Sequence, residues 1–252
     1  MLTRLSLGSI ACLALLSGCV ADGDSATPAM QETASASSVE APPLGKIYTV
    51  RQGADPVIQV GERFTNGDCV VRESLPVGYP RPTAVGSIEI KTYPSVRRAE
   101  ITGTGGPDRG TTMGFWPLFQ HISTRDIAMT TPVEMDLPGW SAEDESAPEQ
   151  WTMSFLYRTP DLGDTGRDGM IVIRDTDPVT VLAIGVKGSY TTQNFTTPMR
   201  ELEAWLAESG DWEQAGAPRW FGYNGPSVPV GLRWSEVQIP IQPVSAAVAE
   251  RE

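Results

Sequence analysis

Cysteine and histidine are scarce in this chain of 252 residues, which has three cysteines and one histidine, His121. Cys12 and Cys19 fall in an N-terminal targeting segment, which leaves Cys69 alone in the rest of the chain. One thiol forms no internal disulfide and no Cys-x-x-Cys metal site. With one histidine and no Gly-x-Ser-x-Gly sequence, a Ser-His-Asp hydrolase is not supported. We therefore predict that the chain is not an enzyme.

Positive charge is also in short supply. The chain has 19 lysines and arginines against 31 aspartates and glutamates, for a net charge of -12 at pH 7. This balance argues against nucleic acid as a partner and against docking on anionic lipid through the protein surface. It also bears on Cys69, because the nearby Asp68 and Glu73 favour a protonated, unreactive thiol.

Phosphate-binding and calcium-binding motifs are missing as well. The segment 103–110, GTGGPDRG, is rich in glycine but lacks the Lys-Ser/Thr that ends a phosphate-binding loop. The acidic segment 161–169 lacks the spacing and the final glutamate of a calcium-binding EF-hand. Both segments are interpreted as loops.

No hydrophobic run is long enough to cross a bilayer, but residues 1–19 have a short one. One cation, Arg4, precedes an apolar stretch to Leu16, which is typical of a signal peptide. Its last four residues, Leu16-Ser17-Gly18-Cys19, match a bacterial lipobox. We therefore expect lipid on Cys19 and a lipid-anchored protein of the bacterial cell envelope, since two acyl chains anchor stably. The alternative is an ordinary signal peptide with a chance cysteine.

Composition divides the rest of the chain into three parts. Residues 20–45 are rich in Ala, Ser, Thr, Pro and Glu, so they cannot bury enough surface to offset the entropy of ordering. We interpret them as a flexible tether. Residues 46–242 are long enough for one folded domain, and residues 243–252 form a C-terminal tail.

Short segments rich in β-branched and aromatic residues indicate strands through most of the folded part. We expect strands at 87–93, 151–158, 170–174, 179–186 and 232–241. In the first of these, Ile88 and Ile90 alternate with Glu89 and Lys91. In the last, the apolar parity switches after Trp234, which predicts a bulge or a strand buried differently at its two ends.

Two amphipathic helices are expected between the strands. The first covers about 114–123, and Pro117 would then lie in its first turn, because a deeper proline breaks a hydrogen bond. The second would begin after Thr197 as N-cap, with Pro198 as its first residue, and would stop at Gly210. Strands and helices in this order predict an antiparallel α+β domain.

Five phrases of the folded part follow one another in the order of a known family. They are SIEIKTYPSVRRAE from Ser87, FWPLFQHI from Phe115, IAMTTPVEM from Ile127, WTMSFLYRTP from Trp151 and FGYNGPSVPVGLRWSEVQIPI from Phe221. The most informative is IAMTTPV, which matches I-x-M-T-x-P-V. Together they resemble the SOUL family of haem-binding proteins, and the SOUL-like haem-binding domain would occupy residues 46–242.

The resemblance implies a fold. Members are distorted eight-stranded antiparallel barrels, built from two similar halves, with two packed helices. The architecture is similar to the effector-binding domains of bacterial multidrug regulators, which hold amphipathic small molecules in a groove.

The resemblance also implies non-covalent haem, but two departures bear on how the iron would be held. Where one branch of the family has a proposed axial histidine, this chain has Thr92, and a hydroxyl is a poor iron ligand beside imidazole or thiolate. His121 stands instead where relatives carry tyrosine on the first helix. The link Ser123–Asp126 is also shorter than the turn that relatives have there. We therefore expect haem binding to depend on an apolar groove beside the first helix.

The candidate ligand-binding residues are Phe115, Leu118, Phe119, His121, Ile122 and Met129. His121 has two interpretations: an imidazole at the sheet–helix boundary bonded to a backbone carbonyl, or an axial ligand to haem iron. Met129 and Met135 carry thioethers, although methionine more often fills irregular core space. Trp116 and Trp205 are further aromatic candidates for the groove.

Three functions are consistent with these features. The first is a non-catalytic, membrane-tethered module that binds haem or another planar hydrophobic molecule. The second keeps the fold but binds a lipid, a drug or a cationic effector, and an acidic residue facing the groove, such as Glu134, would favour it. The third is an envelope interaction protein without a small ligand.

Overall fold

A computed structural model of the chain describes residues 40–143 and 148–244. The predicted signal peptide, Cys19, most of the tether and most of the C-terminal tail lie outside the described residues. No helix within these two described stretches is long and apolar enough to cross a membrane.

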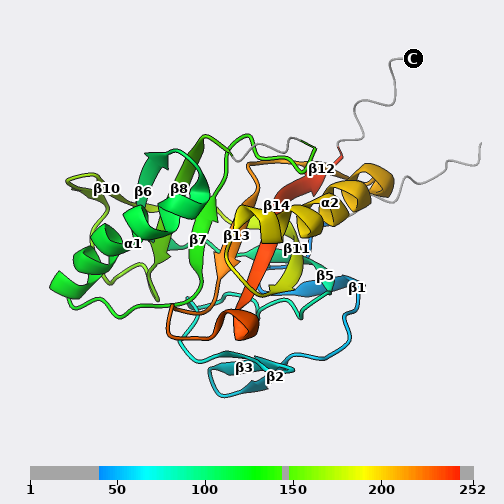
Figure 1. The fold of residues 1–252 in the computed structure, drawn as a ribbon, viewed down its shortest axis with the longest axis horizontal. Helices are drawn as coiled ribbons and strands as arrows, with labels where there is room; N and C mark the ends of the chain where they lie inside the picture. The colour runs from blue at the N-terminus through cyan, green and yellow to red at the C-terminus, as the bar shows by residue number, and fades with distance from the viewer. Residues whose placement is uncertain (1–39, 144–147, 245–252) are drawn as a thin grey trace, which may run out of the picture. The chain divides into compact units, whose positions relative to one another are not determined.

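The fold is built on one large antiparallel sheet with two helices (Figure 1). The strands of this sheet are β1 (Ile47–Arg51), β5 (Ile88–Tyr93), β6 (Arg97–Thr104), β7 (Val133–Asp136), β8 (Gln150–Leu156), β9 (Gly166–Asp168), β10 (Ile171–Asp175), β11 (Val179–Lys187), β12 (Trp212–Gln214), β13 (Arg219–Gly222) and β14 (Trp234–Pro243). Strands β2 (Ile58–Val60), β3 (Arg63–Asn66) and β4 (Cys69–Val71) form a smaller sheet. The helices are α1 (Pro107–Thr124) and α2 (Thr192–Ser209), and a 3-10 turn spans Val230–Leu232.

Strand order shows two halves of the same design. The large sheet runs β1-β5-β11-β14-β13-β7-β8-β6-β10-β9, with β12 paired to β14. Inside the outer strands β1 and β9, the order β5-β11-β14-β13 in one half corresponds to β10-β6-β8-β7 in the other. Helix α1 follows β6 and helix α2 follows β11, and these two strands hold equivalent places in the two halves. The edges of this eight-strand stretch, β5 and β10, pair with β1 and β9. The predicted α+β class is confirmed, and closure of the eight strands into a barrel stays a prediction.

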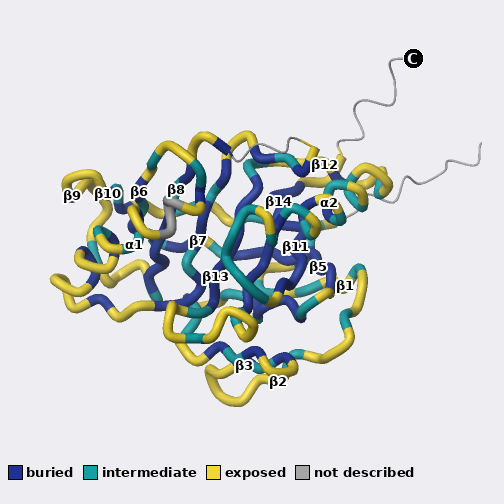
Figure 2. The backbone as a smooth tube through the Cα atoms, viewed as in Figure 1, coloured by how far each residue is buried: buried dark blue, intermediate teal, exposed yellow. Residues whose placement is uncertain are grey.

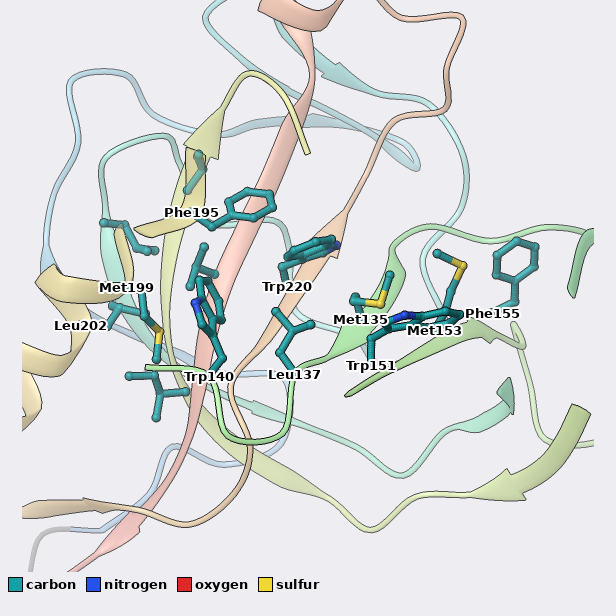
Figure 3. Close-up of a cluster of buried hydrophobic side chains, with 14 of the residues drawn as sticks. Met135, Leu137, Trp140, Trp151, Met153, Phe155, Phe195, Met199, Leu202 and Trp220 are labelled. Atoms are coloured by element: carbon teal, nitrogen blue, oxygen red, sulfur yellow. The ribbon is translucent and has the colours of Figure 1, made fainter. Parts of the chain in front are cut away.

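The inner face of the large sheet packs against both helices. Leu118 and Ile122 of α1 and Phe195, Met199 and Leu202 of α2 are buried in one cluster with the inward side chains of the strands. Figure 3 shows this cluster, in which Trp220 lies beside Phe195 with ring centroids 4.7 Å apart. Trp140 belongs to the same cluster.

The outer face of the same sheet is covered as well. Phe64, Cys69 and Val71 of the small sheet pack against a second cluster that includes Trp234. The strands in the centre of the large sheet are therefore buried on both faces, as the dark tube in Figure 2 shows. Glu89 and Lys91 of β5 alternate with apolar residues as expected, yet they too are buried.

This two-sided burial explains the parity switch in β14. The strand pairs with β11 from Trp234 to Pro240 with no shift of register, so the bulge prediction was wrong. Trp234 faces the outer cluster, whereas Val237 and Ile239 face the inner one. The alternative prediction, different burial at the two ends, is not confirmed, because every residue from Trp234 to Ile241 is buried.

Both helices begin earlier than the sequence predicted. α1 starts at Pro107 inside the segment that was interpreted as a loop, so Pro117 lies in the helix interior and not in the first turn. α2 has Thr191 as its N-cap, so Pro198 is also internal, while Gly210 ends the helix in the left-handed conformation as expected. An internal proline costs about 3 kcal/mol, and burial of apolar side chains on both sides of each proline offsets that cost.

Candidate functional site

A cavity of about 610 Å³ opens between α1 and the inner face of the large sheet. We call it the apolar cavity. Its lining residues are Glu73, Thr112, Phe115, Trp116, Met129, Thr130, Thr131, Val133, Met153, Ser189, Tyr190, Thr191, Trp220, Gly222, Tyr223, Asn224, Gly225, Pro226 and Arg233. The volume lies within the range of about 300–1,000 Å³ that holds small-molecule ligands.

Helix α1 supplies one wall. Thr112, Phe115 and Trp116 stand three and four residues apart, so they share one face of the helix. Phe115 packs edge-to-face against Phe155, with ring centroids 5.2 Å apart, and this contact fixes its orientation. Trp116 is 64% exposed, so a large aromatic face is available at the cavity mouth.

The opposite wall comes from three neighbouring strands. The residues that line the cavity are Val133 of β7, Met153 of β8 and Trp220 of β13. Met135, the β7 residue that is paired with Trp220, packs in the adjacent core. Alternate residues of a strand point to opposite faces of the sheet, so each strand contributes only its inward side chains. At the end of β13, an added Cβ on Gly222 would lie 3.1 Å from the Tyr190 ring, so the glycine lets that ring approach the sheet.

The Met-Thr-Thr-Pro phrase forms one rim of the cavity. Thr130 Oγ1 donates to the Leu156 carbonyl at the end of β8, and Thr131 Oγ1 donates to the Tyr223 carbonyl at 3.0 Å. These bonds tie the rim to two separate strands, because a threonine hydroxyl can satisfy a backbone carbonyl that has no strand partner. Met129 is 36% exposed on this rim.

A second rim is held by Tyr190 and Asn224. The Tyr190 hydroxyl donates to the Trp234 carbonyl and accepts from the Asn224 amide, both at 2.9 Å. Asn224 accepts from the Trp234 amide at 2.7 Å and donates to the Val70 carbonyl at 2.7 Å. Burial raises the pKa of Tyr190, so the hydroxyl stays protonated and keeps its donor role.

Two charged side chains line the apolar cavity. Glu73 is exposed, and Arg233 is half-buried with its guanidinium carbon 5.7 Å from the centre of the Tyr190 ring. Arg233 Nε and Nη2 donate to the Val228 and Pro226 carbonyls, which holds the guanidinium in place. The predicted acidic residue, Glu134, does not line this cavity, because its side chain points to the other face of β7.

His121 lies away from the apolar cavity. It is 3% exposed, its Nδ1 lies 2.7 Å from Asp168 Oδ2, and its Nε2 lies 3.0 Å from the Tyr157 hydroxyl. The expected bond to a backbone carbonyl was wrong, since both partners are side chains. Asp168 also pairs with Arg125 at 2.8 Å, so the histidine ties the β9 hairpin to the end of α1. Neither ring nitrogen can bind iron without losing one of these contacts.

The other predicted site residues are divided between cavity and core. Phe115 and Met129 line the apolar cavity, whereas Leu118 and Ile122 are buried in the core beneath α1. Phe119 stacks on Phe115 with centroids 5.9 Å apart but does not line the cavity. Ligand binding by these residues stays a prediction.

Several lining residues were missed by sequence reasoning, above all Tyr190, Trp220 and Arg233. Trp220 stands one residue before the recognised phrase that begins at Phe221, so strand parity would have placed it inward. Tyr190 and Arg233 lie in loops, where no periodicity marks the direction of a side chain.

Comparison with protein families settles the relationship. A family described as SOUL heme-binding protein matches residues 79–240. The chain belongs to this family. The matched range includes the first four recognised phrases, all but Ile241 of the fifth, and most of the large sheet, but it excludes β1 to β4. None of the curated proteins matches the chain in sequence.

Solved structures share the fold at low identity. EcmrR in a complex with DNA has a TM-score of 0.52 and 14% identity, covering 62% of this chain and 57% of that chain. The C-terminal domain of EcmrR alone has a TM-score of 0.51 and 14% identity, covering 62% of this chain and 98% of that domain. A hydrolase from Listeria innocua has a TM-score of 0.46 and 12% identity, covering 64% of this chain and 94% of that one. This chain thus spans little more than half of EcmrR, and the likeness shows the fold alone.

The SOUL family is described as haem-binding, and the apolar cavity provides more apolar surface for a porphyrin ring than donor atoms for an iron. Trp116 and the half-buried Phe115 offer flat apolar surfaces to a planar molecule, whereas Trp220 lines the cavity but is only 3% exposed. The thioethers of Met129 and Met153 are the soft iron donors among the described lining residues, and Met153 is 2% exposed. No cluster of three or more His, Cys, Asp or Glu side chains that would hold a metal ion occurs in the described parts of the chain.

Proposed function

We propose that this SOUL-family domain binds haem, or another planar amphipathic molecule, in the apolar cavity without catalysing a reaction. The observation that carries the proposal is a cavity of about 610 Å³ with Phe115 and Trp116 of α1 on one side and the inward, mostly apolar side chains of β7, β8 and β13 on the other. Burying apolar ligand surface yields about 25 cal/mol per Å², so contact with both walls supplies the affinity. Family membership adds haem as the first ligand to test.

Haem would sit here mainly through its ring. Arg233 is the cation that lines the apolar cavity, and it would pair with a propionate, because arginine binds carboxylates through parallel N–H donors. Met129 is the more exposed of the two thioethers and would be the residue available to hold the iron. Bound haem would supply a redox-active iron, and the protein would supply orientation and exclusion of water.

The same proposal includes a lipid tether. Lipid on Cys19 would hold the domain at a membrane of the cell envelope, with residues 20–45 as the flexible connection. Mass spectrometry of the purified protein tests this directly: a diacyl adduct on Cys19 is expected, and an unmodified cysteine would contradict it.

Haem titration tests the binding proposal. We expect a saturable Soret change with a Kd below about 10 µM, and no such change would refute haem binding. Trp116→Ala should weaken binding about tenfold, or 1.4 kcal/mol, because an aromatic face is lost. Met113→Ala is the matched control, since Met113 is 65% exposed on the same helix and does not line the cavity.

Iron ligation needs separate variants. Met129→Leu keeps the apolar volume and removes the thioether, so it should change the haem spectrum if Met129 ligates. His121→Ala should leave the spectrum unchanged and cost about 1–3 kcal/mol of stability, because it leaves the buried Tyr157 hydroxyl without its partner. A changed spectrum in His121→Ala would instead support the axial-histidine interpretation.

A lipophilic cation is the second candidate ligand. Glu73 lines the apolar cavity, and the aromatic walls suit cation–π contacts. A fluorescent aromatic cation should compete with haem for the cavity. Glu73→Gln should lower the affinity for the cation and change the affinity for haem by no more than a factor of about two. Equal weakening of both ligands would show that Glu73 does not select for charge.

A further inference from the structure

A second cavity, of about 450 Å³, lies on the opposite face of the large sheet. We call it the polar cavity. The three strands that wall the apolar cavity also wall this one with their alternate residues: Thr152 of β8, Glu134 and Asp136 of β7, and Arg219 of β13. Because successive side chains of a strand point to opposite faces, one set of strands separates two cavities of different chemistry.

Buried ion pairs build the floor of the polar cavity. Glu134 is 1% exposed and lies 2.7 Å from Arg219 Nη1 and 3.1 Å from Arg98 Nη1. Arg98 also pairs with Asp136 at 3.1 Å and with Glu100 at 2.8 Å. Glu100 also pairs with Arg174 at 2.9 Å, and Glu134 with Arg219, so Asp136 is the carboxylate of this group whose one ion-pair partner among the described residues, Arg98, is shared.

Two polar groups of this cavity remain unmatched within the described residues. Arg219 is 8% exposed, and its buried Nη2 has no hydrogen-bond partner there. Asp177 lines the cavity, is exposed, and takes part in no ion pair within the same described chain. Buried donors normally have an acceptor, and a bound molecule or water is the usual acceptor when the protein supplies none.

The pKa of Asp136 is raised mainly by its burial. Burial, and then the neighbouring Glu134, raise the pKa of Asp136 to about 7 against the opposing effect of Arg98 and Arg219. The groups that face Asp136 are Glu134 on its own strand, Arg98 on β6 and Arg219 on β13, with Tyr79 in the wall. An additional cation beside Asp136 would stabilise its ionised form.

From this geometry we propose that the polar cavity is a second ligand site, for a small primary amine that carries a hydrogen-bond acceptor. The ammonium group lies between Asp136 and Asp177, and the acceptor oxygen reaches Arg219. Amino alcohols such as ethanolamine have this chemistry. The site is independent of the ligand of the apolar cavity, because the two cavities open on opposite faces of the sheet.

Calorimetric titration of the full chain with ethanolamine at pH 7 tests the proposal, with ethylene glycol as the uncharged analogue. We expect saturable ethanolamine binding with a Kd below about 10 mM, and at least tenfold weaker binding of the glycol. Binding should also release protons, because the cation favours ionised Asp136, so the heat should differ between buffers of different ionisation enthalpy. No saturable binding, or equal binding of the glycol, would overturn the proposal.

Three variants locate the site. Asp136→Asn resembles the protonated carboxyl group, so it should fold, bind ethanolamine at least tenfold more weakly and release no protons. Asp177→Asn changes an exposed residue and should weaken binding about threefold. Glu73→Gln is the matched control in the apolar cavity and should leave ethanolamine affinity unchanged. Unchanged affinity in Asp136→Asn, or a loss in Glu73→Gln, would overturn the assignment.

Discussion

Substitution of Glu236 by glutamine should strongly destabilise the fold. Glu236 is fully buried on β14 and accepts hydrogen bonds from the Thr83 amide at 2.6 Å, from the Tyr223 hydroxyl at 2.7 Å and from Lys91 Nζ at 3.0 Å. Gln238 Nε2 donates to it at 2.7 Å. An amide at this position would direct its own N–H groups at some of these donors and would remove the charge opposite Lys91.

The structure sets the size of the effect. Removing one partner of a buried ion pair costs about 3–5 kcal/mol, because the other charge stays buried without compensation. Lys91 keeps the Arg81 carbonyl at 2.8 Å and the Glu89 carboxylate at 3.6 Å, so the lower end of that range, about 3 kcal/mol, is expected. Urea unfolding measures this difference as a lower midpoint with an unchanged slope.

The loss should depend on pH. Burial alone would raise the pKa of Glu236, but Lys91 and the hydrogen bonds outweigh burial and hold the pKa below the ordinary value of 4.5. A depressed folded-state pKa means that the stabilisation is complete above pH 4.5 and is lost as the pH falls through the folded-state value. The stability difference between wild type and Glu236→Gln should therefore shrink in acid.

A surface ion pair is the control for this experiment. Arg51 and Glu201 lie 2.6 Å apart, but their side chains are 47% and 38% exposed. Glu201→Gln should therefore cost less than about 1 kcal/mol. If Glu236→Gln also costs less than about 1 kcal/mol, or if its cost is the same at pH 7 and in acid, the argument from buried charge is refuted.

Three further predictions concern individual positions. Thr191→Ala should cost about 1 kcal/mol in urea unfolding, because Thr191 caps α2, whereas Thr197→Ala should have little effect, and the reverse order would contradict the helix start. Gly103→Ala should cost about 1–3 kcal/mol, because an added Cβ would lie 2.1 Å from the Trp151 ring, and unchanged stability would disprove that contact. Burial, the largest effect, raises the pKa of the Cys69 thiol, so a thiol reagent followed by mass spectrometry should label Cys69 slowly until urea is added, and rapid labelling of the native protein would argue against burial.

Sequence reasoning predicted the family and five strands, β5, β8, β10, β11 and β14, because both depend on local pattern. The segments 87–93 and 232–241 became β5 and most of β14, and the phrase around Met129 lies within the matched family range. The second helix was recognised from its apolar stripe, but its start was misplaced by six residues, from Thr191 to Thr197. A proline is a strong local signal for a first turn, and only tertiary packing outweighs it.

The candidate site was predicted less completely, since a cavity depends on which side chains meet in three dimensions. His121 attracted attention because it is unique, yet its environment is set by Asp168 and Tyr157, which are far from it in sequence. Trp220 was missed because no strand was predicted over Arg219–Gly222, so no facing was assigned to its residues. Helical spacing correctly placed Phe115 beside a cavity, but it could not separate Phe115 from the core residue Leu118.

The buried charges of the large sheet explain why its two faces remain distinct. A shift of β7 by one residue against β13 would move the side chains of β7 to the other face of the sheet, because side chains alternate along a strand. Glu134 would then enter the apolar cavity and leave Arg219 on the polar side, and Val133 would enter the polar cavity. Buried ion pairs add little net stability but penalise such a slip heavily, since an unpaired buried charge costs several kcal/mol. The Glu134–Arg219 pair therefore fixes the register, and through the register it keeps an aromatic wall on one side of the sheet and a charged wall on the other.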